Sequence, residues 1–311
     1  MVRQLARRVG GFLLTLALTS VLIFALTNVI PGDVARRILG REATQDAVNA
    51  KRAELGLDRS ILVQYRSWLG GFLRGDWGTS YTKGEPVREL VLSHLGRSLE
   101  LGLIAFAVVV PVALGLGLLA GLRNGTRTDR AITVLGLCGT ATPEFVSGVL
   151  LLILFSVRLN WLPSSARDEY GLKGLVLPVI CLVIVCVGYI TRMVRASVVA
   201  TLERPYVRTA RLKGITAAAL VRRHVLRNSL VVPITALGVQ LRYLIGGLIT
   251  VELLFNYAGI GSLLLGAAQE KDLPTLQAAT MVTGVVIMLT FVLTDAIYAW
   301  LDPRVRVGKS R

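Results

Sequence analysis

Long apolar runs are the feature that most restricts the folds open to this chain of 311 residues. A helix needs about 20 apolar residues to cross the hydrocarbon core of a bilayer, and in that core only helices and closed barrels satisfy their backbone hydrogen bonds. Six runs approach or reach this length, so the sequence predicts an all-α membrane protein with six transmembrane helices. The predicted spans are Val9–Ile30, Leu99–Leu122, Ile132–Val157, Leu175–Ile190, Leu230–Leu254 and Leu276–Trp300.

Composition agrees with a membrane protein and argues against a nucleic-acid partner. Hydrophobic residues make up 53% of the chain and charged residues 17%, which is too apolar for a soluble domain. The formal net charge of +16 would suit nucleic acid, but the basic residues flank apolar runs and are not interleaved with aromatic residues that stack on bases. We therefore attribute the positive charge to membrane topology.

Clusters of Arg and Lys set the expected orientation, because basic residues are enriched in cytoplasmic loops. Such clusters precede the first predicted span, fill the short loop after the second and close the chain. They predict that both termini are cytoplasmic and that Pro31–Arg97 lies outside, since long translocated loops largely escape the rule. Pro31-Gly32-Asp33 follows the first run in place of a small-x-small cleavage site, so we interpret that run as an uncleaved anchor.

The outer segment has a helical pattern of its own. Thr44 is placed to cap a helix that ends at Gly56, and apolar residues from Ile61 to Phe72 recur at helical spacing. The sequence predicts that this apolar face packs on the membrane domain, and that a short helix over Val87–Leu95 leads into the second span. The pattern leaves open whether this cap contacts a ligand or only covers the membrane domain.

A basic segment interrupts the apolar pattern between Arg192 and Arg227, with nine Lys or Arg against a single Glu. Pro205 favours a helix start, Gly214 a left-handed stop and Thr216 the N-cap of a second helix. The sequence therefore predicts a rigid docking element on the cytoplasmic side. For each individual cation the alternative is that it only enforces topology.

Signatures of covalent chemistry are missing from the sequence. No Walker A, GxSxG or HExxH motif occurs, and the two histidines, His94 and His224, have no acidic or cysteine cluster beside them. The three cysteines fall inside predicted spans without metal-ligand spacing. We expect no catalytic residues, no metal site and no cofactor bound by this chain.

Proline and ionisable residues punctuate the predicted spans. Pro111, Pro143, Pro178 and Pro233, with nearby glycines, suit either a pathway that opens and closes or ordinary bundle packing.

Intramembrane charge is scarce, so each such residue is a candidate functional site. Arg242 and Glu252 are candidates for lining a pathway or for intramembrane pairing, and pairing is the favoured role for Arg242. No transport role follows for Asp295.

The basic segment resembles a known family. Its sequences YVRTARLKG (Tyr206–Gly214) and RHVLRNSL (Arg223–Leu230) are similar to the EAA loop of binding-protein-dependent ABC importers, in the form found in dipeptide and oligopeptide permeases. Arg208 and Thr209 replace the Glu and Ala of the general loop, a change common in that branch. Further similarity to the B-type permease subunit is carried by LGLD (55–58), QY (64–65), GDWGTS (75–80), VELLF (251–255), GIG (259–261) and DPRVR (302–306).

The resemblance implies a MetI-like type I ABC importer permease with six helices and an extracytoplasmic cap between the first two, in the bacterial cytoplasmic membrane. Expected domains are an anchor at 1–30, the helical cap at 31–97, and a core at 98–311 that contains a coupling loop at 192–228. Implied partners are a C-type permease subunit, two ATPase subunits that bind ATP and Mg, a solute-binding protein and the bilayer. The expected coupling surface comprises Tyr206, Arg208, Thr209, Ala210, Arg211, Lys213 and Gly214.

Alternatives remain for the transported solute and for the class of protein. Relatives in this branch carry peptides, and others carry nickel chelates, glutathione or sugar conjugates, so peptide cargo is an expectation from the resemblance. A secondary transporter would be favoured by an internal repeat or a carboxylate relay, and a membrane enzyme by a convergent catalytic cluster. The sequence displays neither pattern.

Overall fold

The computed structural model describes residues 2–29, 34–40, 42–167, 171–229 and 248–301, and positions 233, 237, 238 and 240; side chains are described for these except at 2–9, 28, 29, 34, 37 and 295–301. Within these ranges every regular element is a helix, and one isolated bridge joins Thr79 to Pro86. The chain divides into two compact units: unit 1 comprises residues 1–97 and 259–289, and unit 2 residues 98–258 and 290–311.

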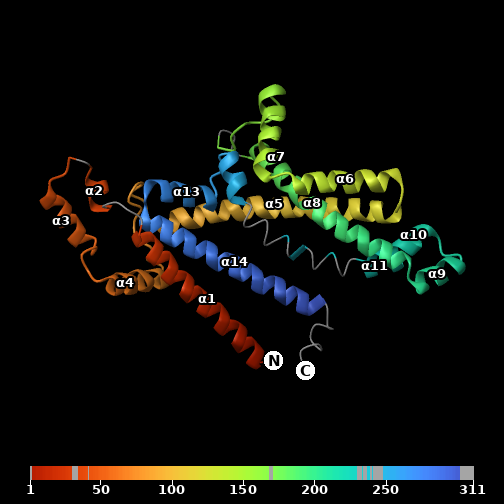
Figure 1. Cartoon of the computed structure of the whole chain (residues 1–311), viewed down its shortest axis with the longest axis horizontal. Helices are drawn as coiled ribbons and strands as arrows, with labels where there is room; N and C mark the ends of the chain where they lie inside the picture. Colours follow the sequence, from red (N-terminus) through yellow and green to blue (C-terminus); the bar gives the residue numbers. More distant parts are fainter. Residues whose placement is uncertain are drawn as a thin grey trace. The chain divides into compact units, whose positions relative to one another are not determined.

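Unit 1 combines the predicted anchor and cap with a helix pair from the C-terminal part of the chain (Figure 1). Its helices are α1 (Val2–Val29), α2 (Val34–Leu39), α3 (Gln45–Glu54), α4 (Ile61–Arg74), the first part of α5 (Val87–Leu122), α13 (Ile260–Glu270) and the first part of α14 (Leu273–Leu301). The core between α5, α13 and α14 is built from Val87, Val91, Ile260, Leu263, Ala278, Ala279 and Val282.

Local signals in the outer segment act as the sequence predicts. The Thr44 side chain accepts a hydrogen bond from the amide of Ala47 at the start of α3. Gly56 follows α3 with a φ of +66°, and Gly75 ends α4 with a φ of +84°. Both glycines occupy the left-handed region that side chains with a Cβ avoid, which explains their positions at helix ends.

A buried carboxylate fastens the turn before α5 to the start of α14. Asp272, 2% exposed, accepts hydrogen bonds from the Ser80 hydroxyl, from the Tyr81 amide at 3.1 Å and from the Thr275 hydroxyl at 2.8 Å. Burial, and then the nearby Asp272 carboxylate, raises the pKa of the Tyr81 phenol. Because Ser80 and Asp272 are far apart in sequence, this contact sets tertiary structure and not merely a local turn.

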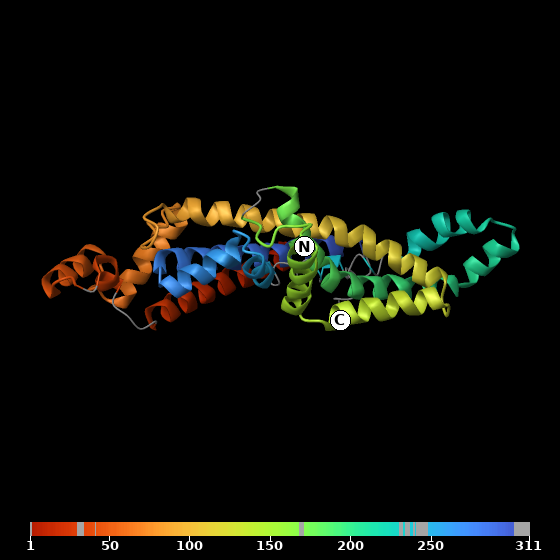
Figure 2. The same cartoon turned by 90° about the horizontal axis from the view of Figure 1, so that it is seen from above.

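Unit 2 is a helical core with a projecting hairpin. It contains the rest of α5, α6 (Arg127–Ala141), α7 (Glu144–Leu151), the π-helical η1 (Leu152–Arg158), α8 (Leu172–Leu202), α9 (Pro205–Leu212), α10 (Ala217–Leu220), η2 (Val221–Val225) and α11 (Leu226–Ser229). The most buried helix is α8, whose side chains form much of the core with Leu101, Val109, Val251 and Phe255. Figure 2 shows the hairpin of α9 and α10 beyond the end of α8.

Glycine allows the helices of unit 2 to approach closely. A Cβ on Gly117 of α5 would lie 2.5 Å from the Cβ of Val194 in α8, and one on Gly188 of α8 would lie 2.0 Å from the carbonyl oxygen of Gly136 in α6. Such distances are shorter than any real Cβ contact, so these positions require glycine. Small residues at helix interfaces are typical of membrane proteins, where packing replaces the hydrophobic driving force.

Four described helices are long and apolar enough to cross a membrane: Gly10–Thr27 within α1, α5, α8, and Leu273–Thr294 within α14. The pair of α6 with α7 and η1 would make five if it counts as one span. The four helices agree with the first, second, fourth and sixth predicted spans, and the bent pair covers the third. Most of the fifth, Leu230–Leu254, lies outside the described residues, as do Pro233's neighbours and Arg242.

The third predicted span, Ile132–Val157, is wrong as a single straight helix. α6 ends at Ala141 and α7 begins at Glu144, with a bend of 104° between them (Figure 1). Pro143 has no amide hydrogen, and its ring disfavours helical backbone at the preceding residue. Thr142 accordingly adopts an extended conformation. Continuous hydrophobicity across this proline concealed the break.

Two predicted helices are longer than expected. The short helix at Val87–Leu95 and the second span form one continuous helix, α5, because no proline separates them. The fourth span continues to Leu202, so residues 192–202 of the predicted loop are the last turns of α8. The helix ends just before Pro205, with Arg204 in an extended conformation, as expected for a residue that precedes proline.

Candidate coupling site

The cytoplasmic docking element predicted from sequence is a short helical hairpin. Pro205 occupies the first turn of α9, where its missing amide hydrogen costs nothing. Gly214 follows α9 with a φ of +75°, so it reverses the chain as a left-handed stop. Thr216 takes the extended backbone of an N-cap before α10, although its side chain makes no capping hydrogen bond. The predicted helix–turn–helix frame is therefore confirmed.

A small core of its own stiffens the hairpin. Val207, Ala210 and Leu220 are buried together, and Leu202 and Ile215 pack against them. Ala210 thus lies inside the hairpin, although the sequence placed it on the coupling surface. Its spacing of three residues from Val207 puts both on the inner side of α9.

The opposite side of α9 and the following turn are open. Tyr206, Arg208, Thr209, Arg211, Lys213 and Gly214, the other members of the predicted coupling surface, are all exposed. The Thr209 hydroxyl bonds to the carbonyl of Pro205 at 3.1 Å, so it supports its own helix. The cations thus surround a projecting turn, an arrangement that suits contact with an acidic surface.

Sequence reasoning missed Leu212, which is 81% exposed between Arg211 and Lys213. A leucine this exposed at the tip of a projecting turn is a candidate for the apolar centre of a contact with charged surroundings. The sequence does contain a sign of this role, because Leu212 is an apolar residue between two cations.

An ion pair holds the base of this element. Arg195, in α8, donates from Nε and from Nη2 to the two carboxylate oxygens of Asp129 in α6, the Nη2 contact at 2.8 Å. Nη2 also donates to the Asn124 side chain at 2.9 Å. Such a two-pronged contact fixes geometry as well as charge. Arg195 lies two helical turns before the end of α8, so the pair ties the helix that carries the hairpin to α6.

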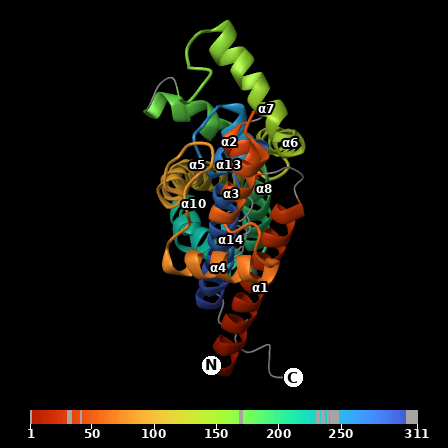
Figure 3. The same ribbon diagram turned by 90° about the vertical axis from the view of Figure 1, so that its left-hand side faces the viewer.

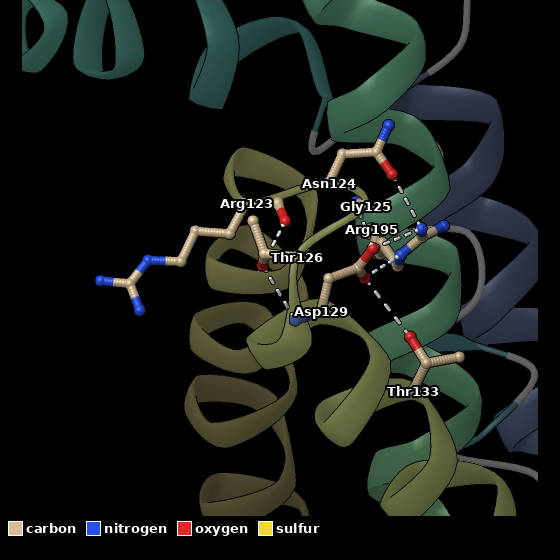
Figure 4. A network of polar contacts seen from close by, with 7 residues as sticks. All are labelled: Arg123, Asn124, Gly125, Thr126, Asp129, Thr133 and Arg195. Atoms are coloured by element: carbon tan, nitrogen blue, oxygen red, sulfur yellow. Dashed lines mark hydrogen bonds and ion pairs between the residues drawn. The ribbon is translucent and has the colours of Figure 1, made fainter.

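Asp129 belongs to a dense polar turn at the start of α6 (Figure 4). The carboxylate is 3% exposed and also accepts from the Gly125 amide at 2.9 Å. Thr126 caps α6, accepting from the amide of Asp129 and donating to the carbonyl of Arg123. The side chain of Arg123 points away from the pair. Sequence reasoning assigned Arg123 and its neighbours only to topology and missed Asp129 and Arg195, because the two partners are far apart in sequence.

The helical segment that follows the hairpin, α11, is also fastened to α8. The Ser197 hydroxyl donates to the carbonyl of Ser229 at 2.7 Å, and α11 packs on α8. The hairpin is thus joined to α8 at both of its ends.

The two intramembrane candidates have different outcomes. Arg242 lies outside the described residues. Glu252 is fully buried in unit 2 and accepts a hydrogen bond from the Ser98 hydroxyl. Both roles, lining a pathway and intramembrane pairing, therefore stay predictions for Glu252.

Comparisons with known proteins identify the family. A family model described as the binding-protein-dependent transport system inner membrane component matches residues 113–307. The chain belongs to this family. A model for the N-terminal part of such membrane components matches residues 1–101, so the likeness extends over nearly all of the permease. Together with its long apolar helices, membership makes the chain a multi-pass inner-membrane protein.

Relatives match the permease over its full length. A putative peptide permease protein of Brucella ovis is 36% identical, covering 97% of this chain and 98% of the relative. A putative peptide transport system permease protein of Brucella abortus is 33% identical, covering 98% and 99%. The glutathione transport system permease protein GsiC of Salmonella choleraesuis is 33% identical with the same coverage.

Solved structures show the same fold. The MetNI methionine ABC transporter in inward-facing form aligns with a TM-score of 0.57 and 18% identity, over 70% of this chain and 99% of that chain. An amino acid ABC transporter crystallised with histidines aligns with a TM-score of 0.52 and 17% identity, over 68% and 94%. The permease therefore has the MetI-like fold expected from its sequence.

Proposed function

We propose that this permease is one of two membrane subunits that form the translocation pathway of an ATP-driven importer for peptides. The full-length match to relatives named as peptide permeases supports the cargo class. The exposed, basic hairpin at the end of α8 supports the coupling role and is the observation that carries the proposal. The second membrane subunit is a C-type permease, and a solute-binding protein delivers the peptide from outside.

The proposed topology has six spans with both termini in the cytoplasm. Four helices, the bent pair of α6 with α7, and the region around Leu230–Leu254 supply the six. Basic clusters at the chain ends and in the loop at 123–130 support the orientation. In this topology the outer segment 31–97 is the extracytoplasmic cap, and the hairpin of α9 and α10 projects into the cytoplasm.

Coupling follows from the connection between the hairpin and α8. Two partner ATPase subunits, which bind ATP and Mg, close on nucleotide and move the docked hairpin. Because α9 follows α8 after two residues, the motion passes to α8, and the Arg195–Asp129 pair passes it on to α6. The pathway then alternates between inward-facing and outward-facing states, and each partner acts through unequal affinity for these states.

Glutathione is the second candidate cargo. It is favoured by one observation, the full-length match to a relative named as a glutathione permease. Glutathione is itself a small peptide, so the two cargoes share recognition of amide and carboxylate groups. Retention of candidate solutes by the cognate solute-binding protein decides between them. A binding protein that retains only nickel chelates or sugar conjugates would contradict both.

Gly214 provides the sharpest test of coupling. A Cβ at this position meets nothing within 4 Å in this chain, so within the permease a substitution acts through the backbone, where a left-handed residue other than glycine costs about 1–2 kcal/mol. Gly214→Val is expected to abolish the stimulation of ATP turnover by the loaded binding protein while the permease still inserts and assembles.

Gly214→Asn is the matched control, because asparagine tolerates left-handed backbone, and it should keep most of the stimulation. Equal, unimpaired stimulation in both variants would contradict the proposed hairpin mechanism. A purified permease that carries no ATPase subunits, yet transports solute, would instead indicate a secondary transporter.

A further inference from the structure

Part of the apolar surface of helix α4, in unit 1, is left exposed by its contacts with the rest of the protein. Its aromatic side chains face α1: the Tyr65 hydroxyl bonds to that of Ser20 at 2.8 Å, and the rings of Tyr65 and Trp68 lie 5.4 Å and 5.7 Å from the ring of Phe24. Figure 3 shows α4 running across α1 and not along it. The aromatic flank therefore fastens α4 to the first membrane span.

The neighbouring flank of α4 is aliphatic, and it is uncovered within unit 1 at both ends, with one half-buried leucine between them. Leu62, Leu69 and Leu73 recur seven and four residues apart, so they form one stripe beside the aromatic side chains. Leu62 is 71% exposed and Leu73 is 76% exposed. On the opposite side of the helix, Gln64 and Ser67 are among the α4 residues that line an open cavity of about 310 Å³. The leucine flank therefore faces away from that cavity.

The contact with α1 places this stripe at membrane depth. Ser20 and Phe24 lie inside the apolar part of α1 that is long enough to cross a membrane. A helix that packs on this part of a span, with an apolar side that the protein leaves uncovered, is in the position of a membrane-surface helix.

The surface of α1 next to α4 is also uncovered. Leu13 lies seven residues before Ser20, on the same side of α1, and is 58% exposed. α4 therefore packs on a membrane-spanning helix that itself leaves apolar side chains uncovered. The occupant that this contact favours is the lipid that surrounds α1.

Charged and aromatic residues of α4 fit the same position. Arg66 and Arg74 are exposed on the helix, Arg66 beside the leucine stripe, where long basic side chains reach the phosphates of lipid headgroups. Tyr65 and Trp68 are residue types enriched at membrane interfaces. Anionic phospholipid suits this combination of leucines and arginines.

We propose that α4 is an interfacial membrane helix: its leucine stripe contacts acyl chains of the leaflet at the Thr27 end of α1, and Arg66 and Arg74 contact lipid phosphates. Part of the segment between the first two spans is then embedded in the bilayer and does not stand clear of it. This inference needs only the membrane location of the permease, so it holds or fails independently of its cargo and coupling.

Photo-crosslinking tests the proposal in the assembled transporter in vesicles of phosphatidylethanolamine and phosphatidylglycerol. Benzoylphenylalanine replaces Leu62 or Leu73, with Ser67, exposed on the cavity side, as the matched control position. The expected result is a phospholipid adduct at 62 and 73, detected by mass spectrometry, and at least a tenfold smaller yield at 67. A crosslink from 62 and 73 to another polypeptide, or equal yields at all three positions, would overturn the proposal.

A second measurement uses the unaltered permease, in case a variant fails to assemble. Carbene labelling with a lipid-soluble diazirine is expected to modify the peptide that contains Leu62–Leu73, and a water-soluble diazirine is expected to leave its leucines unmodified. Labelling of Leu62 and Leu73 by the water-soluble reagent alone would refute membrane contact.

Discussion

The two units hold their helices together by different means. In unit 2, glycines let α5, α6 and α8 approach until there is no space for a Cβ, and an arginine neutralises the buried carboxylate of Asp129. In unit 1, aromatic rings separate α1 from α4, and the buried carboxylate of Asp272 is held by hydroxyl and amide donors. The difference teaches that unit 2 holds its helices close together around α8 by glycine contacts and an ion pair, whereas unit 1 relies on bulky contacts and neutral donors.

The largest expected effect tests the close packing of unit 2. Gly117→Ala places a Cβ 2.5 Å from Val194, and overpacking of this kind costs about 1–3 kcal/mol. We expect a lower melting temperature of the purified permease and reduced transport. Gly284→Ala in unit 1 is the control, because its Cβ would meet only Thr19 at an ordinary 3.9 Å. Equal effects of the two substitutions would remove the contrast between the units.

An effect of similar size is expected when the ion pair of unit 2 is broken. Arg195→Ala leaves the buried Asp129 carboxylate without its cation, which costs about 2 kcal/mol. Adding Asp129→Asn should restore part of the melting temperature, since the neutral amide needs no counter-charge. Arg192→Ala, at an exposed position of the same helix, serves as the control.

The same double variant separates stability from coupling. If the pair transmits motion, the double variant should transport less peptide per ATP hydrolysed than the unaltered permease, even if its melting temperature is partly restored. A normal ratio in Arg195→Ala would show that the pair only holds the fold.

The smallest effect is expected at the carboxylate of unit 1. Asp272→Ala removes the acceptor of several neutral donors but leaves no buried charge without its partner, so we expect a loss of about 1 kcal/mol. Faster hydrogen exchange of the Tyr81 amide would report the loss. Asp58→Asn, at an exposed position, serves as the control and should leave that exchange unchanged. A larger loss of stability from Asp272→Ala than from Arg195→Ala would reverse the expected order of the two effects.

Local sequence signals predicted most of the helices and the hairpin of the coupling site. Pro205 and Gly214 act through backbone geometry that depends on their own residue type, so they could be recognised without a structure. Pro143 acts in the same way and does break the helix. The prediction ran through it because the residues on both sides are apolar. Ala210 was misplaced because position in a loop does not tell which side of a helix a residue occupies.

What the sequence determined by itself is what depends on composition and on short-range geometry: a multi-pass helical protein, its basic projecting hairpin, and the motifs of its family. Only the tertiary structure decided which residues distant in sequence meet, namely Arg195 with Asp129 and Ser80 with Asp272, and which glycines have no room for a Cβ. The reason is physical, since hydrophobicity and backbone preference are properties of single residues and their neighbours. An ion pair or a helix contact is a property of two segments, and its geometry exists only once both are folded.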